Sequence, residues 1–306
     1  MCCMHFARKK HMKWRVCMNI FAAIRNIGFP ELGIDPMKID NVAFNVFGKD
    51  VYWYGVIIAV GFILALAFAA YRFKKEGMKT DDLLDIALFS VPIGIIGARL
   101  YYVVFNHTQF SSFYEVIAIW DGGLAIYGGV IFGVITALLV CRFKKLSIGK
   151  VFDILCISLM IGQAVGRWGN FVNGEAFGAI TQLPWGMTIN GTGPWHPTFF
   201  YESLWNVLGI VLLLLWGKYL KKQNGEIFWG YMAWYGLGRA FIEYLRTDSL
   251  MIGDFKVSLI LGAVFFLAGA LRIVWLRTKM PPEEALADGE IPVQEAKESE
   301  IAEAAE

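Results

Sequence analysis

The chain has few charged residues and few cysteines for its length. Only 18% of its 306 residues are Asp, Glu, Lys or Arg, whereas a soluble domain carries about 25%. The five cysteines form no Cys-x-x-Cys pair, and the four histidines show no metal-ligand spacing. These absences argue against a disulfide framework and against a structural zinc site. We therefore expect no metal and no organic cofactor.

Long hydrophobic runs are present instead. The chain is 57% hydrophobic, with a mean hydropathy of +0.52. Seven apolar runs come close to the roughly 20 residues that a helix needs to cross a bilayer. They lie at about 51–71, 83–104, 122–141, 151–169, 199–217, 227–246 and 256–276. The predicted fold is all-α, a polytopic membrane protein with about seven transmembrane helices.

The charges between these runs predict their orientation. Clusters of Lys and Arg follow the first, third, fifth and seventh runs, whereas 105–119, 168–198 and 247–255 contain neither residue. Loops rich in Lys and Arg stay in the cytoplasm. The N-terminus is therefore predicted outside, the C-terminus in the cytoplasm, and the loop 170–198 outside. Because the basic residues cluster at the ends of spans, a nucleic-acid partner is not needed to explain them.

The N-terminal part, residues 1–36, is predicted to be an arm outside the transmembrane domain. Residues 1–17 carry five basic residues and no apolar run long enough for a signal peptide. That charge lies on the wrong side for the predicted orientation, which leaves two alternatives: a structureless arm, or a chain that begins at Met18. Residues 18–36 are predicted to be an interfacial segment.

The C-terminal part has the opposite charge. Residues 281–306 contain nine acidic residues and one Lys. Such a composition does not bury enough apolar surface to fold. We predict a disordered cytoplasmic tail at 280–306 and a transmembrane catalytic domain at 37–279.

The segment Gly166–Gly178 places polar residues at the end of an apolar run. Arg167, Asn170, Asn173 and Glu175 occur within ten residues, beside four glycines. Ionisable groups at membrane depth are costly and usually face a functional cavity. We expect the helix to end in this segment, in a polar pocket that the other helices surround.

A second polar group lies in the sixth run. Tyr235, Arg239, Glu243 and Arg246 follow one another at intervals of four, four and three residues, so they share one helical face. A structural ion pair between Arg239 and Glu243 would explain the spacing. An anion site is the alternative, because the planar guanidinium of Arg is suited to phosphate.

The predicted orientation places further polar side chains at the same outer depth. Tyr54 opens the first span and Tyr127 the third, and Arg167 ends the fourth. Tyr54 and its aromatic neighbours form a group that is more often an interfacial belt than a site. Arg99, at the outer end of the second span, either extends to the interface or binds headgroups.

The motifs resemble those of bacterial prolipoprotein diacylglyceryl transferases. Gly166–Gly178 is similar to that family's signature, Gly-Arg-x-(Gly/Ala)-Asn-Phe-x-Asn-x-Glu-x-x-Gly. Other similar stretches follow in the expected order at 29–34, 53–55, 97–102, 120–123, 196–202 and 235–246. The resemblance covers about residues 28–279.

The resemblance implies an activity in the bacterial cytoplasmic membrane, with a site toward the outer leaflet. Phosphatidylglycerol would donate its diacylglyceryl group to the lipobox cysteine of a prolipoprotein, forming a thioether and releasing glycerol-1-phosphate. The partners would be these two substrates and the lipid bilayer. The family's functional residues map onto Tyr54, Arg167, Asn170, Glu175, Gly178, Tyr235, Arg239 and Glu243.

One position departs from the family pattern. Many members have His-Gly-Gly in the third span, whereas this chain has Tyr127 before Gly128 and Gly129. Either the reaction does not need a histidine base, or another group serves. We predict Arg167, Arg239, Glu243 and Tyr127 as catalytic residues. The predicted substrate-binding residues are Arg167, Asn170, Asn173, Glu175, Gly178, Tyr54, Tyr235, Arg246 and Arg99.

Two other classes of protein remain open. A transporter or flippase would bind a headgroup without chemistry, but it would need gates on both faces, and the polar residues concentrate in the outer half. A purely structural membrane protein would not need Arg, Asn and Glu within its spans.

Overall fold

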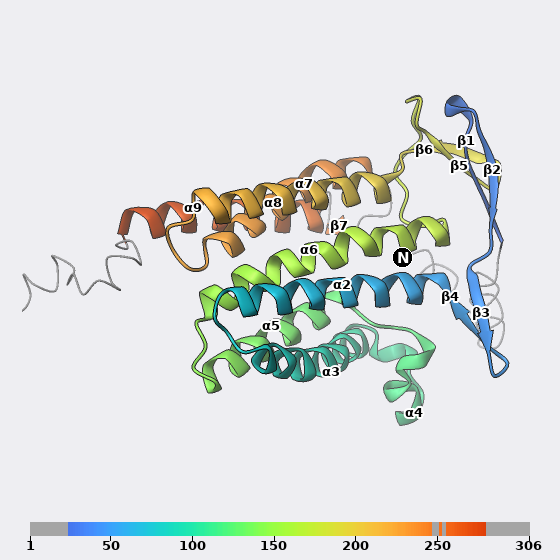
Figure 1. Ribbon diagram of the computed structural model, residues 1–306. Helices are drawn as coiled ribbons and strands as arrows, with labels where there is room; N and C mark the ends of the chain where they lie inside the picture. Colours follow the sequence, from blue (N-terminus) through green and yellow to red (C-terminus); the bar gives the residue numbers. More distant parts are fainter. Residues whose placement is uncertain (1–23, 247–250, 253–254, 280–306) are drawn as a thin grey trace, which may run out of the picture. The chain divides into compact units, whose positions relative to one another are not determined.

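The structure is a computed structural model that describes residues 24–246, 251–252 and 255–279 (Figure 1). Residues 1–17 and 280–306, for which an arm and a tail are predicted, lie outside the described residues. The chain forms two compact units. One comprises the residues up to Leu66 and those from Cys156 onward, and the other comprises Ala67–Leu155. Each unit is considered by itself.

Helices form at all seven predicted ranges. They are α2 (Trp53–Lys75), α3 (Thr80–Phe105), α5 (Ile126–Phe143), α6 (Ile148–Asn173), α7 (Thr198–Tyr219), α8 (Glu226–Leu245) and α9 (Val257–Lys279). Six are long and apolar enough to cross a membrane, and α8 is the exception. Glu226, Arg239 and Glu243 lie in α8. A polytopic helical membrane protein is confirmed, whereas the count of seven spans and the orientation stay predictions.

The six apolar helices expose large hydrophobic side chains. Leu88, Phe105 and Leu271 are each about two-thirds exposed, at 66%, 68% and 68%. Apolar surface on this scale is unfavourable in water and marks a membrane or partner surface. The pattern therefore fits helices that are surrounded by lipid.

The larger unit contains a small sheet that the all-α prediction did not include. Its antiparallel strands have the order β2-β1-β5-β6. They are β1 (Arg25–Phe29), β2 (Ile34–Ile39), β5 (Met187–Ile189) and β6 (Thr192–Trp195), with the 3₁₀ turn η1 (Pro30–Leu32) between β1 and β2. The described part of residues 18–36 forms β1, η1 and the start of β2, and its location at the membrane interface stays a prediction. Ile27, Met187 and Ile189 pack with Phe199 of α7 in a buried cluster.

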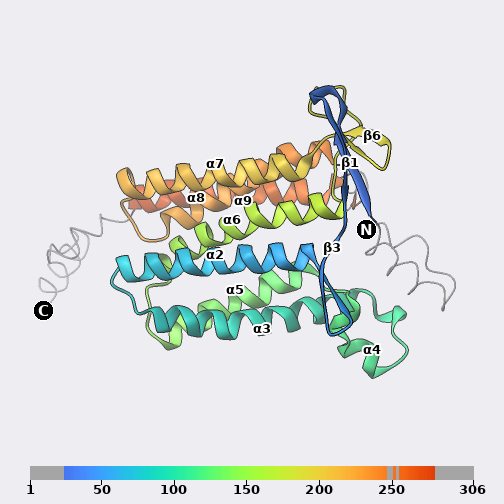
Figure 2. The same ribbon diagram turned by 45° about the vertical axis from the view of Figure 1, so that its right-hand side comes forward.

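Two short hairpins flank the helices of this unit. One pairs β3 (Val42–Val46) with β4 (Lys49–Tyr52), and α2 starts directly after it. The other pairs β7 (Met251–Ile252) with β8 (Phe255–Lys256) before α9. Figures 1 and 2 show α7, α8 and α9 running alongside one another. A Cβ at Gly236 of α8 would lie 2.3 Å from the carbonyl oxygen of Gly262 in α9, so small residues let these helices approach closely.

The smaller unit is built on α3 and α5. A Cβ at Gly128 of α5 would lie 2.3 Å from the carbonyl oxygen of Gly97 in α3. The connection between these helices contains η2 (His107–Gln109), α4 (Phe113–Ile117) and η3 (Ile119–Asp121). The smaller unit is therefore a tightly packed helix pair with a structured loop at one end.

The other end of this helix pair is held by charge. Lys144, just after α5, forms ion pairs with Asp82 (2.8 Å) and with Asp85 at the start of α3. Hydrogen bonds to Asp82 and then Asp85 raise the pKa of Lys144. The ammonium therefore stays charged through the neutral range.

The prediction that the fourth helix ends within Gly166–Gly178 is confirmed, although its end lies a few residues beyond the approximate position 169. The helix continues to Asn173. A glycine within a helix costs about 1 kcal/mol relative to alanine, but Gly169 has a packing reason. A Cβ there would lie 2.7 Å from the ring of Tyr54 in α2. The glycine thus allows close contact between two helices instead of ending one of them.

Candidate functional site

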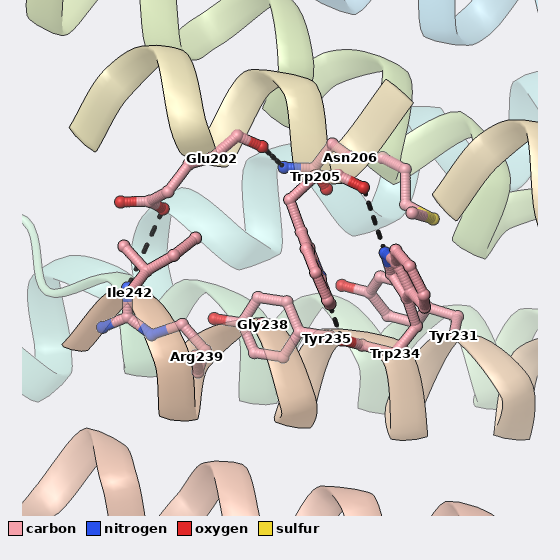
Figure 3. A pocket seen from close by; sticks show the side chains of 10 residues that line it. Glu202, Trp205, Asn206, Tyr231, Trp234, Tyr235, Gly238, Arg239 and Ile242 are labelled. Atoms are coloured by element: carbon pink, nitrogen blue, oxygen red, sulfur yellow. Dashed lines mark hydrogen bonds and ion pairs between the residues drawn. The ribbon is translucent and has the colours of Figure 1, made fainter. Parts of the chain in front are cut away.

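Five charged side chains meet at one end of α6, α7 and α8; we call them the Arg–Glu cluster. They are Arg167, Glu202, Arg239, Glu243 and Arg246. Glu202 of α7 forms an ion pair with Arg167 of α6. Its carboxylate oxygens also lie 3.8 Å from Nη1 of Arg239 and 3.5 Å from Nη1 of Arg246. Figure 3 shows Glu202 facing Arg239 across the gap between α7 and α8.

The α8 part of the cluster follows from helix geometry. Arg239 and Glu243 are four residues apart, and Nη2 of Arg239 donates to Oε2 of Glu243 at 2.7 Å. Just beyond the helix, Lys256 donates to the carbonyl oxygens of Glu243 (2.7 Å) and Arg246 (2.9 Å). A cation at a helix C-terminus is favourable. Lys256 therefore fixes the helix end that carries the cluster.

Burial divides the cluster into two kinds of side chain. Only 6% and 2% of the Glu202 and Glu243 side chains are exposed, whereas Arg167 keeps 27%, Arg239 18% and Arg246 15%. Buried carboxylates need partners, and here the guanidiniums supply them. The arginines retain enough exposure to meet a ligand. The three guanidiniums and two carboxylates carry one net positive charge.

The contacts around α6 and α7 hold the cluster in place. Nε1 of Trp168 donates to Oγ of Ser203 at 3.3 Å, and that hydroxyl donates to the carbonyl oxygen of Ala164 at 2.9 Å. Trp168 and Ser203 directly follow Arg167 and Glu202 in the sequence. The same two side chains also line an apolar groove between α2, α6 and α7.

The rest of the signature segment forms a small polar network. The side-chain amides of Asn170 and Asn173 donate to Oε1 of Glu175 at 3.2 and 3.0 Å. The amide N–H of Glu175 also bonds the carbonyl oxygen of Asn170 at 3.0 Å. The structure therefore brings these three predicted residues together at the end of α6.

Gly178 connects this loop to the end of α8. It forms an isolated antiparallel bridge with Arg246, and its N–H donates to the carbonyl oxygen of His196 at 2.9 Å. A Cβ at Gly178 would lie 2.8 Å from Cβ of His196 and 2.9 Å from the carbonyl oxygen of Leu245. A larger residue at 178 would displace the backbone that leads to Arg246.

A cavity extends from the cluster between α7 and α8 (Figure 3). Its lining includes Glu202, Tyr235 and Arg239. Trp205 and Trp234 hold its walls, since each indole N–H donates to the other residue's carbonyl oxygen, at 3.2 and 3.1 Å. Their rings stack with centroids 4.2 Å apart. The predicted residue Tyr235 therefore lies at the same cavity as Arg239.

The smaller unit holds two predicted residues, Arg99 and Tyr127. Arg99 is 8% exposed, and its guanidinium donates to four backbone carbonyl oxygens. Those oxygens belong to Glu115, Val116, Gly122 and Gly123. Tyr127 lies in the first turn of α5, is 41% exposed and lies near the ring of Tyr101. The hydrogen bonds of Arg99 thus stabilise the loop between α3 and α5. Its role in substrate binding stays a prediction.

Sequence reasoning found most members of the cluster but missed two contributors. Arg167, Arg239, Glu243 and Arg246 were predicted and lie together. Glu202 lies in the similar stretch 196–202 but was not predicted as a site residue, although a charge at this position within an apolar run was a signal. Lys256 gave no signal beyond its charge. Among the described residues, no group of three or more His, Cys, Asp or Glu side chains could hold a metal ion.

The fold defines a multi-pass membrane protein, in which three arginines gather around two buried glutamates. The family model for prolipoprotein diacylglyceryl transferase matches residues 41–275. The chain therefore belongs to the prolipoprotein diacylglyceryl transferase family, a family of transferases.

Three relatives carry the name phosphatidylglycerol–prolipoprotein diacylglyceryl transferase. The protein from Clostridioides difficile is 41% identical over 79% of this chain and 97% of its own length. The one from Finegoldia magna is 46% identical over 76% and 94%. The one from Listeria monocytogenes is 42% identical over 84% and 96%. The similarity therefore covers nearly the whole of each relative.

Proposed function

We propose that this chain transfers the diacylglyceryl group of phosphatidylglycerol to the lipobox cysteine of prolipoproteins. The products are a thioether-linked lipid and glycerol-1-phosphate. The names of the relatives support this reaction. The observation that carries it is the convergence of Arg167 and Arg239 on Glu202. Two guanidiniums from different helices at one point suit a phosphodiester.

The reaction breaks one C–O bond and forms one C–S bond. The cysteine sulfur attacks the carbon of the diacylated glycerol that is bonded to the phosphate oxygen. The phosphate oxygen keeps the electron pair of the broken bond, and the thiol proton passes to solvent or to the product phosphate. Donors aimed at developing charge are worth about 3–4 kcal/mol each in known enzymes. Arg167 and Arg239 would supply that stabilisation, with Glu243 orienting Arg239.

Other residues of the site would place the substrates. A nearby cation favours the thiolate form of a cysteine, so one arginine would also assist thiol ionisation. Asn170, Asn173 and Glu175 would bind glycerol hydroxyls or shape their loop. The apolar groove beside Trp168 would offer the acyl chains a surface away from water. Tyr127 would supply a hydrogen bond.

The proposed setting is the bacterial cytoplasmic membrane, with the site facing the outer leaflet. The alternation of loops rich in Lys and Arg with loops that lack both residues supports this orientation. The N-terminus would then lie outside and the C-terminus in the cytoplasm. The proposed organisation keeps 37–279 as the catalytic domain, between an N-terminal arm and an acidic tail.

The test is lipidation of a lipobox peptide by the purified chain in membranes containing phosphatidylglycerol. The wild type should shift the mobility of the peptide by forming the thioether. Arg239→Ala should reduce that rate about 100- to 1,000-fold, as loss of one charge-stabilising donor does, while still inserting into the membrane. Arg272→Ala is the control, because Arg272 lies in α9 over the ring of Trp275.

Two results would reject the proposal. Lipid flux without a covalent product from the wild type would indicate a transporter. Turnover by Arg239→Ala equal to that of Arg272→Ala would show that Arg239 does not stabilise the phosphate charge during the reaction.

A further inference from the structure

Glu202 is placed differently from the other carboxylates of the site. Glu243 pairs with one arginine on its own helix. Glu202 instead contacts three arginines that come from α6, from α8 and from the residue after α8. Its side chain is 6% exposed. This carboxylate therefore joins separate parts of the chain at the point where the guanidiniums meet.

We propose that Glu202 is a positioning residue that also limits the positive potential of the phosphate site. The inference rests on the proposed function. Through its ion pairs, Glu202 keeps Arg167, Arg239 and Arg246 around one point. Its negative charge also offsets part of theirs, which weakens the binding of the phosphate product and allows it to leave.

The charge of the phosphate changes during the reaction. A phosphodiester carries one negative charge, whereas a phosphate monoester carries about −1.5 to −2 at pH 7. The electrostatic energy of a ligand is proportional to its charge. In a given positive potential, the favourable electrostatic energy of the product is therefore up to about twice that of the substrate headgroup. Three arginines without Glu202 would bind the product too firmly for rapid turnover.

This reasoning predicts an unusual effect for Glu202→Gln, which keeps the shape and removes the charge. The site potential should rise, so the affinity for phosphatidylglycerol should increase or stay the same. The affinity for glycerol-1-phosphate should increase more. The change in the logarithm of the affinity should be up to about twice as large for glycerol-1-phosphate as for phosphatidylglycerol, because the product carries about twice the negative charge. The value of kcat should fall because product release becomes slow.

The experiment measures kcat, KM for phosphatidylglycerol and the inhibition constant of added glycerol-1-phosphate with the full chain. Glu202→Asp keeps the negative charge and should keep product inhibition near that of the wild type, even if its kcat is lower. Glu76→Gln is the control, because Glu76 pairs with Arg72 on an exposed helix end outside the cluster. It should leave all three quantities unchanged.

A second neutralised carboxylate keeps the test decisive if Glu202→Gln does not fold. Glu243→Gln raises the same potential and should also tighten product inhibition. An inhibition constant that is unchanged or weaker in each folded neutral variant, with KM raised, would overturn the inference and leave Glu202 a purely structural residue. A wild-type chain that forms no thioether would instead reject the proposed function.

Discussion

Arg99 is the buried cation in the smaller unit whose removal should be most costly. Its guanidinium donates to carbonyl oxygens of Glu115 (2.6 Å), Val116 (2.8 Å), Gly122 (2.5 Å) and Gly123 (3.0 Å). Arg99→Met keeps most of the apolar volume and removes every donor. The variant therefore isolates the hydrogen bonds that hold the loop between α3 and α5.

The size of the effect follows from those four bonds. A hydrogen bond to a charged group contributes about 1.5–3 kcal/mol, but freed carbonyls in a loop can turn toward water. We therefore expect a net loss of about 3–5 kcal/mol, similar to that for breaking a buried ion pair. At about 1.6 °C per kcal/mol for a chain of 306 residues, the midpoint of thermal unfolding should fall by about 5–8 °C.

The assay compares thermal unfolding of the full chain in detergent with that of Arg72→Met. Arg72 makes an ion pair with Glu76, four residues later and just after the end of α2, and such pairs contribute about 0.3–0.5 kcal/mol. Limited proteolysis gives a local measure, because cleavage between residues 106 and 125 should precede global unfolding in Arg99→Met. Equal midpoints and a protease-resistant loop in both variants would refute the reasoning. A raised KM for phosphatidylglycerol at unchanged stability would support headgroup binding by Arg99 instead.

Two further predictions concern Tyr127 and His196. Tyr127→Phe should slow lipidation of the peptide without abolishing it, since only the proposed hydrogen bond is lost; a wild-type rate would show that Tyr127 only packs. Burial lowers the pKa of His196 below its ordinary value of 6.5, so the unfolded chain binds a proton more readily. Stability should therefore fall as the pH drops from 6.5 through the folded-state pKa. Unfolding midpoints measured from pH 7 to pH 5 should show this loss, and His196→Gln should reduce it. An equal loss in His196→Gln would assign it to other groups.

Local patterns in the sequence predicted the features that depend on residues close together in the chain, namely the helices and one ion pair within a helix. Apolar runs placed all seven helices within a few residues, and the four-residue spacing placed Arg239 beside Glu243. The apolar run gave an approximate end for α6 at residue 169, whereas the helix continues to Asn173, and Gly169 within it packs against Tyr54. A tertiary contact overrode the local preference.

Contacts between distant residues could not be predicted from such patterns. Glu202 acquires its meaning from arginines that lie far along the chain in both directions, and its own neighbours suggest only a helix start. The sheet has the same difficulty, because Gly28 pairs with Thr188, 160 residues later. Neither strand is long enough to be distinguished from a loop by its sequence alone.

The pairing of β1 with β5 also imposes an order on biogenesis. Ribosomes add about 5–20 residues per second, so Ile27 is made roughly 8–30 s before its partner Ile189. During that interval four hydrophobic helices, α2, α3, α5 and α6, must enter the bilayer while the hairpin of β1 and β2 keeps an unpaired edge. The sheet is completed only when β5, which follows α6 in the chain, pairs with β1. Its formation is therefore a late step in the folding of the nascent polypeptide.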